Sequence, residues 1–234
     1  MVDYSQKAYE CINRDFSVSE IKKALKSDDD IIKSAAIIKI YEIDTEIAEL
    51  LIFNLTNQSG PIRELSAYKL CTLIRNYKDY FQKTETLNVI IKSLNDVNPN
   101  VVRFILQTLD YFDNKIYIFK SLLQKITELY DEIANKPRRG KAQEHIFTKK
   151  CFKIYWSLES IKELIKADKH VLFEDEKINP NFIKILYNLC DIEEYTIREK
   201  IAQIVNLLPI KEFYDIKKKL TNDENYFVKR QTGV

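Results

Sequence analysis

Four cysteines and two histidines are the side chains of this sequence best suited to nucleophilic or metal chemistry. They are Cys11, Cys71, Cys151, Cys190, His145 and His170. The cysteines lie far apart and form no C-x-x-C motif, and neither histidine has another histidine or a cysteine three or four residues later. Zinc sites need such ligands at short, defined spacings, so the sequence predicts no metal and no cofactor. Cys151 and His145 are six residues apart, which places them on different faces of a helix and disfavours a Cys–His nucleophile.

Motifs of the common catalytic classes do not occur in the sequence. It contains no G-x-G-x-x-G, no Walker loop, no H-E-x-x-H, no G-x-S-x-G and no EF-hand loop. Neighbouring carboxylates such as Glu193 and Glu194 fall where we expect turns, and an exposed acid or a helix N-cap is their ordinary role. The sequence therefore predicts no catalytic residues and favours a protein that is not an enzyme.

The densest charged segment of the sequence runs from Lys136 to Lys141 and holds four cations in six residues, with a proline and a glycine. Such a segment could contact phosphate groups or an acidic partner, or it could be a solvated loop. Both interpretations stay open, although more lysines follow it on the next expected helix. The candidate contact residues are Lys136, Arg138, Arg139, Lys141, Lys149, Lys150, Lys153 and Trp156.

The overall composition indicates a globular protein that remains in the cytoplasm. Lys and Arg number 37 against 35 Asp and Glu, so a net charge of +2 on 234 residues does not by itself indicate nucleic-acid binding. Three glycines and five prolines are few for a mostly β or Rossmann-like fold. The first residues are polar, no apolar run is long enough to span a membrane, and the dispersed cysteines suit a reducing compartment. The abundance of Ile, Lys, Asn and Tyr is typical of AT-rich genomes, those of many bacteria and of some parasitic eukaryotes, and it carries no functional information.

Apolar residues recur every three or four positions along almost the whole sequence, which predicts helices. Short polar clusters such as 26–30, 56–61 and 95–100 separate these runs and predict turns between helices. Because the connections are short, consecutive helices should pack side by side as antiparallel pairs. The fold class predicted from this pattern is all-α.

One pattern recurs five times: a leucine, a polar turn, then an aliphatic residue followed by a basic one. The aliphatic–basic pairs are Ile32-Lys33, Ile62-Arg63, Val102-Arg103, Ile197-Arg198 and Val228-Lys229. They recur at intervals of about 30 to 40 residues, apart from one longer interval, and this is the period of helical repeats. One helix pair of this size cannot bury both of its apolar faces, so successive pairs must stack to build a continuous core.

The order of an apolar first helix, a turn containing Asp, and Val-Arg at the start of the second helix resembles HEAT and armadillo-like repeats. Asp96 with Arg103, and Asp191 with Arg198, carry this resemblance most clearly. The resemblance implies a right-handed α-solenoid of about five to six helix pairs. It would form a single repeat domain over 1–234, with a basic loop at about 136–141 and an insertion at about 161–179. It also implies a structural ladder of turn acids and helix bases between repeats, drawn from Asp96, Arg103, Asp191, Arg198, Arg63, Lys33 and Lys229.

The resemblance implies a non-catalytic module that binds a protein or peptide on the concave face formed by the second helices. The alternative is a nucleic-acid-binding HEAT protein, possibly similar to the bacterial alkylpurine DNA glycosylases. Trp156 is the single tryptophan, and its nearest following acids, Glu159 and Glu163, do not match the acid pattern of that family. We therefore expect a protein or peptide partner, with nucleic acid as the alternative through the basic loop, no membrane association, and a monomer.

Overall fold

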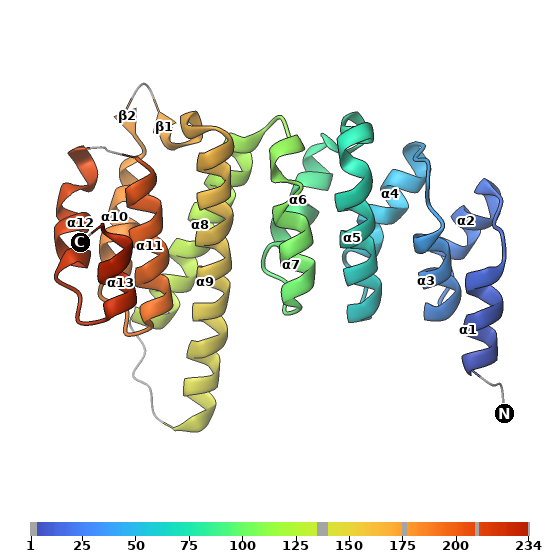
Figure 1. The fold of residues 1–234 in the computed structure, drawn as a ribbon, viewed down its shortest axis with the longest axis horizontal. Coiled ribbons are helices and arrows are strands. Elements are labelled where there is room, and N and C mark those ends of the chain that lie inside the picture. Colours follow the sequence, from blue (N-terminus) through green and yellow to red (C-terminus); the bar gives the residue numbers. More distant parts are fainter. Residues whose placement is uncertain (1–3, 135–139, 175–176, 209–210, 234) are drawn as a thin grey trace. The chain divides into compact units, whose positions relative to one another are not determined.

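The computed structural model describes residues 4–134, 140–174, 177–208 and 211–233, and the chain divides into two compact units, Met1–Asp113 and Asn114–Val234 (Figure 1). Each unit is predominantly α-helical, which confirms the all-α fold class. A two-residue β ladder, β1 (Phe173–Glu174) antiparallel to β2 (Lys177–Ile178), is a small addition to it. No helix in the described ranges is both long and apolar enough to cross a membrane.

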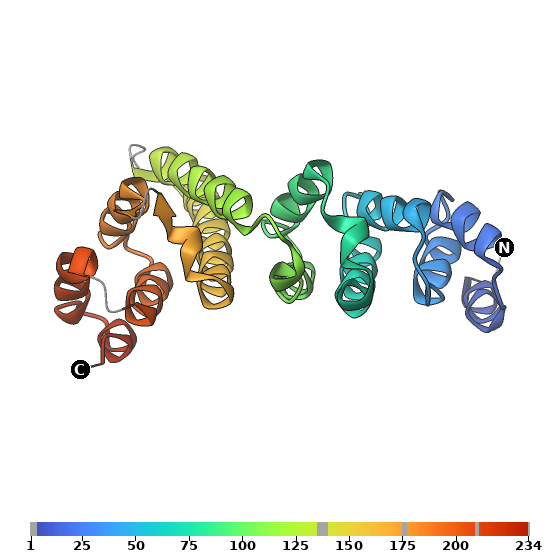
Figure 2. The same cartoon turned by 90° about the horizontal axis from the view of Figure 1, so that it is seen from above.

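Unit 1 consists of short helices in two layers. Its elements are α1 (Tyr4–Asn13), α2 (Val18–Leu25), α3 (Asp30–Ile38), α4 (Thr45–Asn54), α5 (Gly60–Tyr77), α6 (Thr84–Ser93) and α7 (Pro99–Leu106), with 3-10 helices η1 (Lys78–Phe81) and η2 (Leu109–Tyr111). Viewed from above, α2, α4 and α6 form one layer, and α1, α3, α5 and α7 form the other (Figure 2). The second layer is continuous, because each of its helices contacts the next.

Polar side chains in the turns fix where the helices of unit 1 begin. Ser17 and Glu20 form a capping box at the start of α2, in which each satisfies a backbone N–H of the other. Asp29 accepts hydrogen bonds from two backbone N–H groups of α3, and Asp44 does the same for one N–H of α4. Asp29 thus sets the start of the second helix α3, whereas Ser17 and Asp44 set the starts of the first helices α2 and α4.

Unit 2 has the same two-layer arrangement with longer helices. Its elements are α8 (Lys115–Ala134), α9 (Lys141–Ala167), η3 (Lys169–Leu172), β1, β2, α10 (Pro180–Leu189), α11 (Tyr195–Leu207), η4 (Lys211–Phe213), α12 (Tyr214–Thr221) and α13 (Tyr226–Gln231). Helices α8, α10 and α12 form one layer, and α9, α11 and α13 form the other (Figure 2). The segment expected as an insertion at about 161–179 contains the last turns of α9, then η3 and the two strands.

The apolar core of unit 2 lies between its two layers. The buried ring of Phe182 in α10 contacts Phe119 of α8 and Phe213 of η4 edge to face, with centroid distances of 5.3 Å and 6.3 Å, and both partner rings are also buried. Such aromatic pairs stabilise packing beyond the area that they bury. These contacts hold α8 and α10 together at their N-terminal ends, which fixes the geometry of the surface between them.

Candidate functional site

An ion pair connects two successive turns of unit 1. Arg63 of α5 donates from Nε and Nη2 to the two carboxylate oxygens of Asp96, at 2.6 Å and 3.0 Å, in the turn before α7. Its Nη1 donates to the backbone carbonyls of Asn57 and Gln58, in the turn before α5. Asp96 also accepts a hydrogen bond from the backbone N–H of Asn98. One guanidinium therefore joins its own turn to the next.

The same arrangement recurs in unit 2. Arg198 of α11 donates to both oxygens of Asp223, at 2.7 Å and 3.1 Å, and to the carbonyls of Ile192 and Glu193. Burial raises the pKa of the Asp223 carboxyl, but the hydrogen bonds from Arg198 and from the backbone N–H of Asn225 outweigh burial and hold the pKa below its ordinary value. Charge pairing therefore keeps a buried carboxylate ionised, and this pair serves structure rather than chemistry.

The other residues that the sequence assigned to the ladder lie in varied surroundings. Asp191 pairs with Lys219 of α12 at 2.6 Å on the exposed surface. Arg103 is exposed and donates from Nη1 to Oδ1 of Asn100 at 3.5 Å. Lys33 is buried, without an ion pair among the described residues, and Lys229 lies near the carboxylate of Asp223. Each of the two bidentate ion pairs, Arg63 with Asp96 and Arg198 with Asp223, therefore joins residues from two successive copies of the sequence pattern.

The candidate phosphate contacts fall partly outside the described residues, because Lys136, Arg138 and Arg139 belong to 135–139. Lys141 is the first residue of α9, and Lys149 is exposed farther along it. Lys150 makes an ion pair with Glu132 of α8 at 2.5 Å, and Lys153 is half-buried.

Trp156 lies beside a charged network that joins α9 to α11. Glu159 accepts from Lys162 at 2.8 Å and pairs with Lys200, while Lys200 also lies 4.9 Å from the centre of the Tyr155 ring. Burial raises the pKa of Glu159, but hydrogen bonds from Lys162 and Lys200 outweigh burial and hold the pKa below its ordinary value. Both lysines compete with any substrate for this carboxylate, so the geometry disfavours Glu159 as a general base.

Cys71, Cys151 and Cys190 do not have the surroundings of reactive thiols. Burial raises the pKa of the Cys190 thiol to about 12 and also raises the pKa of Cys71. Cys151 is buried. Across the described ranges no three His, Cys, Asp or Glu side chains are grouped closely enough to hold a metal ion.

In unit 1 the face shared by the second helices α5 and α7 is occupied by contacts between its own side chains. Glu64 accepts from the amides of Asn98 and Asn100 at 2.8 Å and 3.0 Å. Tyr68 and Phe104 pack edge to face at 5.3 Å. These groups are satisfied by one another, which leaves little polar capacity for a ligand.

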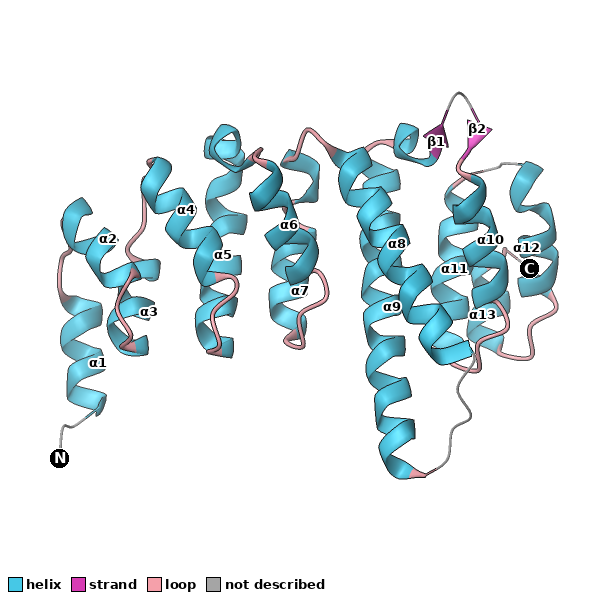
Figure 3. Ribbon diagram, turned by 180° about the vertical axis from the view of Figure 1, so that it is seen from behind, coloured by secondary structure: helices cyan, strands magenta, loops and turns pink. Residues whose placement is uncertain are grey.

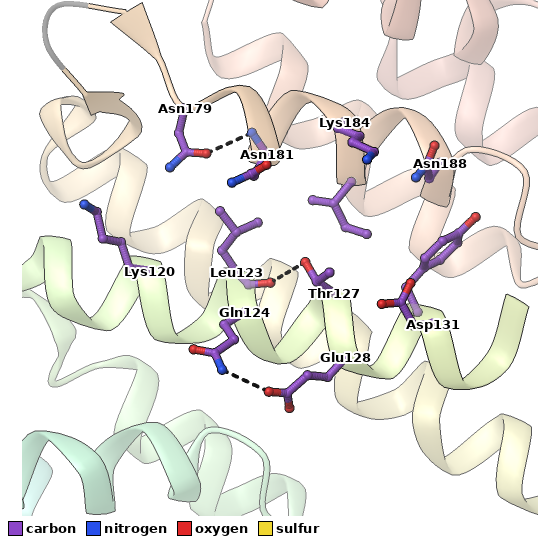
Figure 4. A pocket seen from close by; sticks show the side chains of 12 residues that line it. Lys120, Leu123, Gln124, Thr127, Glu128, Asp131, Asn179, Asn181, Lys184 and Asn188 are labelled. Carbon is purple, nitrogen blue, oxygen red and sulfur yellow. Dashed lines mark hydrogen bonds between the residues drawn. The ribbon is translucent and has the colours of Figure 1, made fainter.

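Helices α8 and α10 lie side by side (Figure 3). A groove between them has a volume of about 630 Å³ (Figure 4). This volume is within the usual range of ligand sites. The apolar side chains of Leu123 and Ile185, both nearly buried, line it together with polar residues of the two helices. The polar lining consists of Lys120, Gln124, Thr127, Glu128, Tyr130, Asp131, Asn179, Asn181, Lys184 and Asn188.

Helix α10 contributes three polar side chains to the groove at helical spacing. Asn181, Lys184 and Asn188 are related as i, i+3 and i+7, which places them on one face. Within the described residues, these three side chains make no hydrogen bond or ion pair to the protein. Asn179 caps α10 by accepting from the backbone N–H groups of Asn181 and Phe182, so the start of this helix is fixed.

Helix α8 forms the opposite side, and its polar groups are partly paired. The side-chain amide of Gln124 donates to Glu128 at 3.1 Å, and the hydroxyl of Thr127 donates to the backbone carbonyl of Leu123. Figure 4 shows Lys120 near one end of the groove and Asp131 near the other. The groove thus combines an apolar floor, unpaired amides and charges of both signs, and it contains no nucleophile with an adjacent base.

The groove was not foreseen from the sequence. Asn181, Lys184 and Asn188 have the spacing of a solvated helix face, which is the ordinary interpretation of polar residues on a helix. The one clue is that α10 carries two side-chain amides seven residues apart on that face.

Comparison with known proteins adds no family. No family model matches the chain, and no curated protein matches its sequence. The chain is similar to two engineered proteins whose crystal structures come from the Northeast Structural Genomics Consortium, with 13% and 12% sequence identity and TM-scores of 0.43 and 0.42. These matches cover 93% of this chain, and 94% and 96% of the two engineered chains.

Proposed function

We propose that this protein is a non-catalytic binding module of the HEAT-repeat type, and that it holds an extended peptide segment of a partner protein in the α8–α10 groove. The HEAT assignment is supported by the two bidentate links, Arg63 to Asp96 and Arg198 to Asp223. Each joins the turns of successive helix pairs, as the sequence resemblance implies. The groove lies in the layer of first helices, whereas the sequence favoured the second helices.

The observation that carries the peptide proposal is the pair of unpaired amides on α10, Asn181 and Asn188. A side-chain amide offers one acceptor and two donors, which match the N–H and C=O of a peptide bond. On an α-helix these two residues are about 10 Å apart along the axis, close to the span of three residues of extended chain. The amides can therefore bind the main chain of one peptide at two points.

The dimensions of the groove also suit a short peptide. Lys120 and Asp131 are separated along α8 by about 16 Å, a length that about five extended residues cover. The apolar floor of Leu123 and Ile185 can accept one aliphatic side chain of the peptide. Because charges of both signs line the groove, the peptide need not be strongly charged.

The nucleic-acid alternative has weaker support. Among the candidate phosphate contacts, Lys150 is already paired with Glu132, and the carboxylate nearest to Trp156 along α9, Glu159, pairs with two lysines. A glycosylase would need a carboxylate free to act on its substrate or on water. Peptide binding instead uses the amides of Asn181 and Asn188, which make no side-chain hydrogen bond to the described residues.

A peptide selection tests this function. A displayed library of random peptides would be selected on the full chain, and an enriched peptide would be labelled and measured by fluorescence polarisation. We expect the groove variant K184A/N188A to bind it at least tenfold more weakly. The control variant N76A/K92A, which removes one exposed amide and one exposed ammonium from unit 1, should bind as the wild type does. Equal affinity of the groove variant would contradict the proposal.

A further inference from the structure

Lys33 of α3 is the counterpart of the two arginines that form the bidentate links. Lys33, Arg63 and Arg198 are each the fourth residue of their helix. Arg63 of α5 pairs with Asp96 in the turn before α7, and Arg198 of α11 pairs with Asp223 in the turn before α13. Helix α3 packs on α5 as α5 packs on α7 (Figure 1). The partner of Lys33 should therefore lie in the turn before α5.

In the turn before α5, Asn57 takes the place that Asp96 and Asp223 have in their turns. Oδ1 of each of these three side chains accepts a 2.8 Å hydrogen bond from the backbone N–H two residues later, that of Ser59, Asn98 or Asn225. Oδ2 of each aspartate accepts from Nε of the arginine. Asn57 has Nδ2 in place of Oδ2, and an amide nitrogen is a donor. The acceptor of the other two links is thus replaced by a second donor.

Both donors of the α3–α5 link lack a partner. Lys33 is only 6% exposed, and buried charged groups are normally paired. Within the described residues, neither Nζ of Lys33 nor Nδ2 of Asn57 makes a hydrogen bond or an ion pair. Neither atom is fully sealed from water, so a small group can reach it. The link therefore offers one positive charge and two kinds of donor, and it lacks the carboxylate that completes the other two links.

We propose that Lys33 and Asn57 form a binding site for a carboxylate group from outside the chain, supplied by an acidic side chain of a partner protein or by a small free acid. Such a carboxylate would accept from Nζ of Lys33 and from Nδ2 of Asn57. It would stand where Oδ2 of Asp96 and of Asp223 stand in the other links. Hydrogen bonds between an ammonium and a carboxylate are stronger than those between neutral groups.

Acids close to this site do not prevent a carboxylate from binding. The turn before α3 carries acids at positions 28, 29 and 30, of which Asp29 pairs with Lys7. The turn before α11 likewise carries acids at positions 193 and 194. Burial raises the pKa of the Asp223 carboxyl in that link, but the hydrogen bonds from Arg198 and from the backbone outweigh burial and hold the pKa below its ordinary value. A link of this kind thus holds an ionised carboxylate beside acidic neighbours.

Titration of the ¹⁵N-labelled full chain with sodium acetate, against sodium chloride at the same ionic strength, tests the site by NMR. We expect acetate alone to cause a saturable shift of the backbone amide of Ser59, which donates to Asn57. The variant K33M should bind acetate at least about tenfold more weakly, the loss expected for a hydrogen bond to a charged group. The variant N57D supplies the carboxylate from within the chain and should abolish the response. The control K92M removes an exposed ammonium of α6 and should respond as the wild type does.

A peptide titration distinguishes the two sources of the carboxylate. The peptides Gly-Asp-Gly and Gly-Asn-Gly, both acetylated and amidated at their ends, differ in one carboxylate. A saturable shift with the Asp peptide but not with acetate would support a side chain of a partner, and equal responses to both would support a free acid.

The variant N57D also has a readout without ligand, so the test remains informative if K33M does not fold. It should raise Tm, because a carboxylate at this position completes the link to Lys33. A lower Tm of N57D would overturn the proposal. The absence of any shift with acetate and the Asp peptide, or a shift that both variants leave unchanged, would overturn it too.

Discussion

Replacement of Arg198 by methionine is the most informative stability experiment on the ion pairs that join successive helix pairs. Both side chains of the Arg198–Asp223 pair are 8% exposed. Without the guanidinium, a buried carboxylate and the carbonyls of Ile192 and Glu193 lose their partner. Breaking a buried pair by removing one member costs about 3 to 5 kcal/mol, because the other charge stays buried without compensation.

The expected loss is large relative to the stability of a domain of this size. For a chain of this length, 1 kcal/mol corresponds to a change in Tm of about 2 to 4 °C, so R198M should lower Tm by about 6 to 20 °C. Thermal unfolding followed by circular dichroism at 222 nm measures this change. A double variant, R198M/D223L, should recover part of the loss, because it no longer buries a lone carboxylate.

The pair between Lys219 and Asp191 provides a matched control, because it also joins successive helix pairs. Its side chains are 31% and 68% exposed, and exposed pairs contribute about 0 to 1 kcal/mol. The variant K219M should therefore lower Tm by less than about 4 °C. If R198M cost no more than K219M, the ladder would not be a determinant of stability and the reasoning would be refuted.

Three further predictions concern acid, thiol reactivity and nucleic acid. The pKa of Asp223 in the folded protein is depressed below the ordinary 3.8. The stabilisation by its ionised carboxylate is therefore present above pH 3.8 and is lost as pH falls through the folded-state pKa. The difference in Tm between wild type and D223N should narrow as pH falls from about 6 to about 3. A constant gap would contradict this. Burial raises the pKa of the Cys190 thiol to about 12, so this thiol should resist alkylation at neutral pH until the protein is unfolded. Mass spectrometry of the alkylated peptides measures this, and labelling of Cys190 in the native protein would refute it. Titration of the protein with fluorescent DNA and RNA should show no binding at low salt. The nucleic-acid alternative would be favoured by micromolar binding that falls steeply with salt and disappears when Arg138, Arg139 and Lys141 are replaced by serine.

The sequence was most informative where one local rule repeats along the chain. Apolar spacing of three and four residues predicted the all-α fold, because that spacing alone lets a helix bury one face. The recurring turn also singled out Arg63, Asp96 and Arg198 as structural residues. It did not reveal that Arg63 reaches forward to Asp96, or that Asp223 is the partner of Arg198. Those pairings depend on how one helix pair stacks on the next, and the spacing within one copy does not contain that information.

The α8–α10 groove and the ring contact between α11 and α13 depend on tertiary packing and were not predictable from helical periodicity. The α8–α10 groove exists because Phe119 and Phe182 hold the two helices at one end, and a polar stripe on α10 looks the same whether it faces a groove or open solvent. The rings of Tyr195 and Phe227 are distant in sequence and meet because α11 and α13 are neighbours. Helical spacing does not distinguish these exposed rings from the buried rings of Phe119 and Phe182.

Hydrogen exchange of the full chain, measured with and without a selected peptide, tests most directly whether a peptide binds between α8 and α10. We expect the peptide to slow exchange in the segments that line the groove, 120–131 and 180–189, and to leave α9 and α11 unchanged. Protection confined to α9 and α11, with 120–131 and 180–189 unaffected, would contradict the claim and return the site to the layer of second helices.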